Sequence, residues 1–258
     1  MNRTVQDIRT INNDYKQQVE AWQGTYTGTS FVFNDRDHTE KDYARTQLIL
    51  IADNPGIEEL HQRRYLVSEP QGPSKNTAGR IAWDFFPEYL GFTRADTIIA
   101  NKCAIHSPKT TDLKLLRKTH PDLLATTQKR AAQLVADLHQ ALATTNPQVL
   151  VWVCGLAGCW DSKTRSWRKP GIRGNYPATA ILPEFYAELA DRYRQFPAAL
   201  RNQLVITKHF SRGQFFHDLE GIQTHSLNGL RKAGLTPEEV LSQVRGLDYS
   251  SKLLNPDQ

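Results

Sequence analysis

The 258-residue chain has few cysteines, and their number and spacing exclude the usual cysteine-based frameworks. Only Cys103, Cys154 and Cys159 are present, an odd count that does not suit a set of paired disulfides. Four residues separate Cys154 from Cys159 and no second pair stands elsewhere, so the spacing of zinc and iron–sulfur sites is missing. We expect reduced thiols in a cytoplasmic protein.

Long hydrophobic runs are also missing. No apolar segment approaches the roughly 18 residues that a membrane-spanning helix needs. The first residues, 1–4, have no apolar run behind them. We therefore expect neither a membrane partner nor a secretory signal.

The loops that commonly hold phosphates or nucleophiles are absent as well. The sequence has no G-x-x-x-x-G-K-[ST] loop, no well-placed G-x-G-x-x-G and no G-x-S-x-G turn. It also lacks a group of metal-ligating residues at a familiar spacing. These absences argue against nucleoside triphosphate, dinucleotide and serine-hydrolase chemistry, and we expect no cofactor and no metal.

The charge and composition are those of an ordinary globular protein. Hydrophobic residues make up 39% of the chain, which is enough for a sizeable core. Lys and Arg number 32 and Asp and Glu 27, giving a net charge of +5. This modest excess permits a nucleic-acid partner without requiring one.

The order of apolar patterns predicts an α/β fold. Short apolar runs typical of strands buried on both faces alternate with helical patterns. The strands are expected at 47–52, 96–101, 148–155 and 203–207, and the helices at 5–22, 76–86, 121–142, 183–195 and from 236 onward. We expect one domain over 1–258, with a helical N-terminal arm at 1–46 and a loose tail at 246–258.

Polar residues follow each predicted strand. Asp53, Asn54, Pro55 and Gly56 come after the first, and Asn101, Gly155 and His209 end the others. The carboxyl ends of parallel strands share one edge, where ligands of such sheets bind. Such a group can orient a water and stabilise a developing anion without a covalent intermediate. A simple capping turn at 53–56 and a structural role for His209 are the alternatives.

A basic stretch interleaved with aromatic residues lies at 161–176. Its cations could contact phosphates while its rings stack on bases, as in proteins that bind single strands. A solvated loop is the alternative. The residues that we expect to bind DNA here are Lys163, Arg165, Arg168 and Lys169.

Several segments, taken in order, resemble motifs of the uracil-DNA glycosylase superfamily. Segment 52–56 resembles its first motif in the Gly-x-Asn-Pro-Gly form, and 72–79 is similar to its Gly-x-Pro-Phe-x-x-x-Ala-Gly stretch. Segment 98–101 resembles the strand that delivers a base-reading Asn, and 146–155 a Pro-led strand ending in Gly. Segment 209–216 is similar to the His-Pro-Ser motif and the Arg-Gly-Phe-Phe that trails it. The resemblance spans about 47–233.

The resemblance implies a three-layer α/β/α sandwich around a four-stranded parallel sheet. It also implies a monomeric, monofunctional N-glycosylase that takes uracil or another deaminated or damaged base out of DNA and needs no cofactor. Asn54 would hold the attacking water, and His209 would stabilise the departing base. The remaining roles it implies are base binding by Asp53, Pro55, Gly56, Ser74 and Asn101, phosphate contacts by Ser211 and Arg212, and a wedge in the base stack from Phe215 or Phe216.

Three residues depart from the pattern of the superfamily. Asn54 stands where a carboxylate is usual, Ser74 where a stacking Phe is usual, and Phe210 where Pro is usual. Two other functions therefore stay open. One is a catalytically inactive nucleic-acid-binding protein of the same fold, and the other is a protein that binds or hydrolyses a small nucleobase-like ligand.

Overall fold

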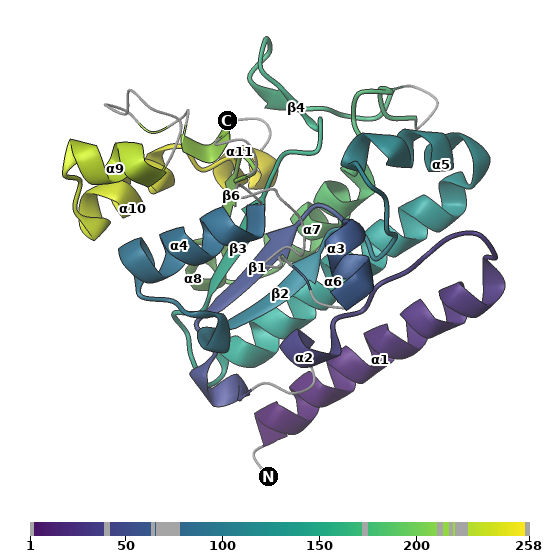
Figure 1. The fold of residues 1–258 in the computed structure, drawn as a ribbon, viewed down its shortest axis with the longest axis horizontal. Helices are drawn as coiled ribbons and strands as arrows, with labels where there is room; N and C mark the ends of the chain where they lie inside the picture. The colour runs from purple at the N-terminus through teal and green to yellow at the C-terminus, as the bar shows by residue number, and fades with distance from the viewer. Residues whose placement is uncertain are drawn as a thin grey trace.

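A parallel sheet of four strands forms the centre of the computed structural model (Figure 1). The structure describes residues 3–38, 42–62, 65, 78–171, 175–210, 214–216, 219 and 227–255. The strands are β1 (Leu48–Ala52), β2 (Thr97–Asn101), β3 (Leu150–Cys154) and β6 (Leu204–Thr207). Their order is β2-β1-β3-β6, and every neighbouring pair is parallel. The predicted α/β class and the four strand positions are confirmed.

Every residue of the four strands is buried, as their continuous apolar runs predict. Successive side chains point to opposite faces of the sheet, so each strand contributes to two separate apolar clusters. In β1, Ile49 and Ile51 face one cluster, whereas Leu48, Leu50 and Ala52 face the other.

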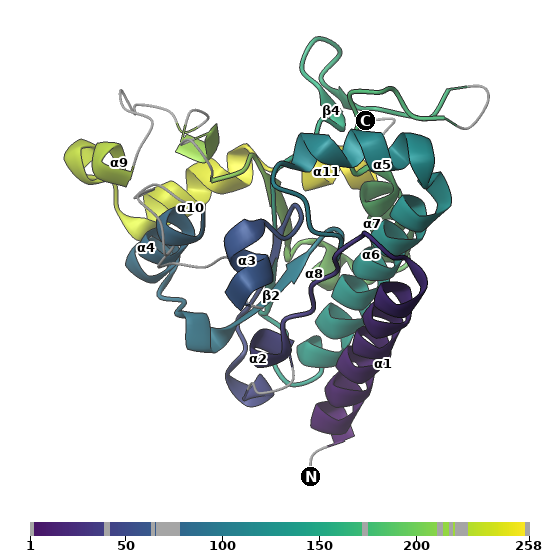
Figure 2. The same cartoon turned by 45° about the vertical axis from the view of Figure 1, so that its right-hand side comes forward.

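One face of the sheet is covered by α1 (Arg3–Thr25), α6 (Pro121–Ala143) and α7 (Pro183–Arg194). Figures 1 and 2 show α1 running alongside α6. The predicted helical face of α1 is confirmed, since Ile8, Tyr15 and Val19 are buried in this cluster. The same side carries α5 (Leu113–Thr119) and α11 (Ser250–Leu254).

The opposite face is covered by α4 (Ala78–Leu90), α9 (Leu227–Ala233) and α10 (Pro237–Gly246). Aromatic rings fill the space between α4 and the sheet: Phe85 and Phe86 contact Trp152 of β3 and Phe210, which follows β6. With helices on both faces, the molecule is a three-layer α/β/α sandwich. The remaining short elements are α2 (Asp35–His38), α3 (Ile57–Gln62), α8 (Ala198–Arg201), the 3-10 helices Tyr43–Arg45, Arg94–Asp96 and Thr110–Asp112, and the hairpin strands β4 (Trp160–Asp161) and β5 (Ser166–Trp167).

Two local expectations need correction, and one short helix was not predicted. The helix α3 follows Gly56, and its start is capped by the Glu59 carboxylate accepting from the Gly56 N–H at 2.6 Å. The tail expected to be loose contains α11, and Leu253 and Leu254 are buried against the core. The helix expected at 76–86 continues through Pro87, and α4 ends at Leu90.

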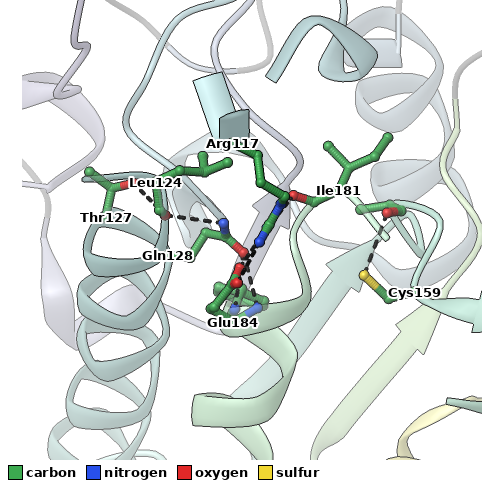
Figure 3. A network of polar contacts seen from close by, with 9 residues as sticks. Arg117, Leu124, Thr127, Gln128, Cys159, Ile181 and Glu184 are labelled. Carbon is green, nitrogen blue, oxygen red and sulfur yellow. Dashed lines mark hydrogen bonds and ion pairs between the residues drawn. The ribbon is translucent and has the colours of Figure 1, made fainter. Parts of the chain in front are cut away.

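The start of α7 is held by a polar network that the sequence pattern does not reveal (Figure 3). Its N-cap residue makes no side-chain cap. Instead, Gln128 of α6 accepts hydrogen bonds from the backbone N–H groups of Glu184 and Phe185 at 3.1 and 3.3 Å. Arg117 of α5 binds both carboxylate oxygens of Glu184 at 2.6 and 2.7 Å and the Ile181 carbonyl at 3.1 Å. The network therefore fixes the segment before α7 against two other helices.

Two general features of the described residues bear on function. No helix there is long and apolar enough to cross a membrane. Within the same residues, no three His, Cys, Asp or Glu side chains are gathered as ligands of one metal ion would be.

Acid should weaken the fold partly through His139 of α6. This side chain is fully buried, and its burial lowers the imidazole pKa from 6.5 to about 4. The unfolded chain therefore binds a proton that the folded chain does not, so stability is complete above pH 6.5 and falls as the pH drops toward 4. The difference amounts to about 3 kcal/mol. In His139→Asn, the free energy of unfolding measured in urea should fall less steeply between these pH values, and an unchanged slope would contradict the assignment.

Candidate functional site

A cavity of about 860 Å³ opens at the carboxyl edge of the sheet. Residues that follow each of the strands β1, β2, β3 and β6 contribute to its lining. The polar residues that line it are Asp53, Asn54, Glu58, Glu59, Ser107, Lys109, Thr110, Thr111, Lys208, His209 and Gln214. The structure thus brings the predicted residues Asp53, Asn54 and His209 into one cavity with Gly56.

The most buried charge at this edge belongs to Lys102, which directly follows β2. Its side chain has no exposed surface, and its ammonium group donates to the Asp53 carboxylate at 2.5 Å. It also donates to the carbonyls of Cys154 at 2.5 Å and Gly155 at 3.0 Å. The three N–H donors of the ammonium are therefore all used, and they join the ends of β1, β2 and β3.

Lys102 was not singled out by the sequence reasoning. A lysine directly after a buried strand would have been the available signal, because a charge placed there must find partners at the edge of the sheet. Tyr186 of α7 was missed too. Its hydroxyl donates to the Gly155 carbonyl, and its ring lies 5.6 Å from the Lys102 ammonium.

Gly155 lets Asp53 and His209 approach each other. Its φ is +89°, in the left-handed region that disfavours side chains. A Cβ at this position would lie 2.9 Å from Asp53 Oδ1 and 3.1 Å from His209 Cδ2. The carboxylate and the imidazole therefore meet above the same glycine, and any side chain there would push them apart.

The segment carrying His209 is anchored by aromatic packing. Phe210 is buried among Phe85, Phe86 and Trp152, and the Phe215 N–H donates to the His209 carbonyl at 3.1 Å. The Phe that stands in place of the usual Pro thus fixes the turn by insertion into the core rather than by a restricted backbone angle.

The electrostatics of the cavity favour an ionised carboxylate beside a neutral imidazole. Burial opposes ionisation of Asp53, but the Lys102 ammonium outweighs it, and the pKa of the carboxyl is lowered. Burial also lowers the pKa of His209, and the Lys102 charge adds to this effect while Asp53 opposes it. At neutral pH the cavity therefore holds a buried ion pair and an uncharged His209.

Asn54 is held by the loop after β2. Its Nδ2 donates to the Ser107 hydroxyl at 2.9 Å and to the Ser107 and Pro55 carbonyls at 3.3 Å. The Ser107 hydroxyl in turn donates to the Lys109 carbonyl at 2.8 Å. No described residue donates to Asn54 Oδ1, so this oxygen remains an acceptor with a fixed orientation on the lining of the cavity.

Asn101 lies at the end of β2 but does not line the cavity formed by the described residues. Its side chain is on the face of the sheet shared with Ala52, because the two residues are register partners. Asn101 is 3% exposed, and neither its amide oxygen nor its amide nitrogen has a hydrogen-bond partner. A buried amide without partners is uncommon and has unused capacity to bind a polar group.

The remaining predicted residues are placed differently. Phe215 and Phe216 are 2% and 1% exposed within the aromatic core, so the expectation of an exposed wedge is corrected: these rings hold the turn after β6. Pro55 is buried, and its carbonyl accepts from the backbone N–H of Ser107 and from His106 Nδ1. Ser74, Ser211 and Arg212 lie outside the described residues.

The basic residues predicted to bind DNA are divided by the structure. Arg165, Arg168 and Lys169 line a second cavity of about 390 Å³, beside the β4–β5 hairpin. Lys163 is exposed at the turn of the same hairpin and does not line that cavity. The stretch 161–176 was expected to be either a solvated loop or a loop that binds a nucleic-acid strand. Its first part instead belongs to a hairpin, β4–β5.

Known proteins do not identify the chain. A scan against models of protein families finds no match, and a search among curated proteins finds none either.

Replacing Gly155 should disrupt the site more than its backbone angle alone explains. In Gly155→Ala, the new methyl group meets Asp53 and His209, so we expect a free energy of unfolding lower by about 2–4 kcal/mol. Gly28→Ala is the matched control, because its φ is +83° and a Cβ there meets nothing within 4 Å. Urea denaturation of both variants measures the difference, and equal losses would contradict the close approach.

Removing the Lys102 ammonium should leave the Asp53 carboxylate buried without its ion-pair partner. We expect the free energy of unfolding of Lys102→Met to be lower by about 3–5 kcal/mol at neutral pH. Because the lowered folded pKa of Asp53 stabilises the wild type above the pKa of the unfolded carboxyl, this advantage disappears as the pH falls through the folded value. The gap between wild type and variant, measured by urea denaturation, should narrow in acid. A gap that stays constant with pH would show that lost packing, and not charge, is responsible.

Proposed function

We propose that the protein hydrolyses the N-glycosidic bond between a nucleobase and its sugar, with uracil or another deaminated or damaged base of DNA as the substrate. One observation carries the proposal: an ionised Asp53, a neutral His209 and the oriented Asn54 line one cavity at the carboxyl edge of the sheet. The resemblance of segments 52–56 and 209–216 to glycosylase motifs supports the same reading.

The reaction needs three tasks that these groups suit. Water adds its oxygen to the anomeric carbon while the C–N bond breaks and its electron pair leaves with the base. Asn54 Oδ1 accepts a hydrogen bond from this water and so aims it. The Asp53 carboxylate stabilises the positive charge that develops on the sugar, and His209 donates a hydrogen bond to a carbonyl oxygen of the departing base.

Proton transfer is the weak part of this arrangement. Asn54 cannot take a proton from the attacking water, and Asp53 is already bound to Lys102. The proton of the water passes to the solvent or to the departing base anion. We therefore propose an enzyme that depends on positioning and electrostatics rather than on a strong general base.

The cavity suits a nucleoside that has left the base stack. Its volume of about 860 Å³ lies within the range of ligand pockets. No aromatic side chain of the described residues lines it; apolar contacts come from Ile57, Leu156, Ala157 and Ile181. Asn101, with both amide atoms unpartnered, is the proposed reader of the base edge once a ligand or side-chain rotation opens the way.

The test is release of uracil from a single-stranded oligonucleotide that contains deoxyuridine. We expect release by the wild type, and a loss of about 100-fold or more in Asn54→Ala and in His209→Ala, since oriented electrostatic contacts contribute on this scale. Asn202→Ala and His120→Ala are the matched controls, because both side chains are exposed and neither lines the cavity. Well-folded wild-type protein that releases no deaminated base would contradict the proposal.

A small nucleoside is a second candidate substrate, and one observation favours it. Glu58 and Glu59 of α3 line the cavity with Asp53, so it holds three acidic side chains against Lys109 and Lys208. This balance suits a neutral ligand better than a polyanion. Comparing hydrolysis of free deoxyuridine with that of the oligonucleotide separates the two, because a nucleoside hydrolase acts on the free nucleoside and a DNA glycosylase on the oligonucleotide.

A further inference from the structure

The second cavity lies between the β4–β5 hairpin and the helices α7 and α11. The hairpin projects beyond the carboxyl edge of the sheet, as Figures 1 and 2 show. It is fastened to the body of the protein by the Trp167 indole, which donates to the Tyr249 carbonyl at 3.2 Å and lies 4.6 Å from the Tyr186 ring. The cavity is therefore part of the packed structure, and its volume of about 390 Å³ suffices for a small ligand.

The charges of this cavity are strongly one-sided. Five cationic side chains line it against a single acid; they are Arg165, Arg168, Lys169, Arg194 and Lys252, and the acid is Asp191. Asp191 is already bound by Arg194 at 3.0 Å. The cavity thus concentrates positive charge that the one carboxylate among its described lining residues neutralises only in part, which is the condition for binding an anion.

Arg194 donates to Asp191 and to the carbonyls of Leu253 and Leu254, whereas the donors of the other cations are only partly used. Arg168 pairs with Asp161 at 3.3 Å, but its Nε is buried without a hydrogen-bond partner. Lys252 lies over the Trp160 ring at 5.6 Å, and Lys169 is exposed with no ion pair to any described residue. Arginine and lysine donors arranged in this way match the oxygens of a phosphate group.

The two cavities share one partition. Leu156, Ala157 and Gly158 line the first, and Cys159, the next residue, lines the second. Tyr186 also joins them: its ring lines the second cavity, and its hydroxyl donates to Gly155 in the first. A ligand that occupies both cavities would therefore place its neutral part against His209 and its anionic part against the hairpin.

We propose that the second cavity binds the phosphate of a nucleotide next to the one whose base enters the first cavity. This inference rests on the proposed function and names how the polymer is recognised. It also accounts for the acidic lining of the first cavity, because the phosphate is bound elsewhere. Arg194 and Lys252, which come from α7 and α11, complete a site that the hairpin residues begin.

The test is the affinity for thymidine 5′-monophosphate, compared with that for thymidine and for inorganic phosphate, by titration calorimetry. Lys169→Gln and Lys252→Gln each remove one cation that holds no described structural contact except the Trp160 ring. Both variants should bind the mononucleotide about tenfold more weakly than the wild type does. Lys129→Gln of α6 is the matched control, since it removes the same charge from an exposed position that lines neither cavity, and it should leave the affinity unchanged.

A short labelled oligothymidylate tests the polymer. Its binding to each cavity variant should weaken, and the slope of log affinity against log salt should decrease in magnitude by about 0.7, as expected when one phosphate contact to a single strand is lost. If the two cavity variants and the control lost the same affinity, the oligonucleotide would be attracted by the general positive charge of the protein, and the proposal would be overturned. Thymidine bound as tightly as its monophosphate, or inorganic phosphate bound as tightly as the nucleotide, would overturn it as well.

The outcomes also separate this site from the proposed activity. One outcome is that Lys169→Gln and Lys252→Gln weaken nucleotide binding while the wild type releases no base. This outcome would support the phosphate site and contradict the glycosylase. Base release with nucleotide binding unaffected by Lys169→Gln and Lys252→Gln would support the glycosylase and contradict the phosphate site.

Discussion

The ammonium of Lys102 is the contact on which the carboxyl edge of the sheet depends. It joins the Asp53 carboxylate to the carbonyls of Cys154 and Gly155, so the ends of three strands meet at one charge. A buried ammonium is strongly unfavourable unless all its donors are used, and here they are. The same charge lowers the pKa of Asp53 against the effect of burial, and it adds to the burial that lowers the pKa of His209. The geometry of the edge and the ionised state of Asp53 therefore depend on one contact.

Local pattern was sufficient to predict the α/β class and the four strands of the sheet but only part of the site. The runs ending at Ala52, Asn101 and Thr207 are apolar on both faces, and such runs have few alternatives to a buried parallel strand. Asn54 and His209 followed from the strand ends, because a parallel sheet brings those ends together. Lys102 did not, because its role depends on carbonyls 52 and 53 residues away in the chain, which no local pattern encodes.

The aromatic residues after β6 show why a motif can mislead about its own neighbours. Phe210, Phe215 and Phe216 follow a histidine that lines the cavity, and exposed aromatic rings would suit contact with nucleic acid. All three are instead buried against α4 and Trp152. Burial of the three rings, together with the Phe215 N–H that donates to the His209 carbonyl, holds the described part of the segment after β6. Only the packing of α4 across the sheet reveals this use of the rings.

The distribution of charge between the two cavities follows from this core. Lys102 and Asp53 cancel each other, and His209 is uncharged, so the deep part of the first cavity presents polarity without net charge. A planar, neutral base can be bound there by hydrogen bonds alone. Phosphate suits this lining less well, because Glu58 and Glu59 offset the charges of Lys109 and Lys208. The excess positive charge of the chain is instead gathered across the segment 155–159, where the hairpin adds three cations to those of α7 and α11. Under the proposed function, this separation by one short segment would give a polymer two points of attachment, and a base would be discriminated without competition from the backbone that carries it.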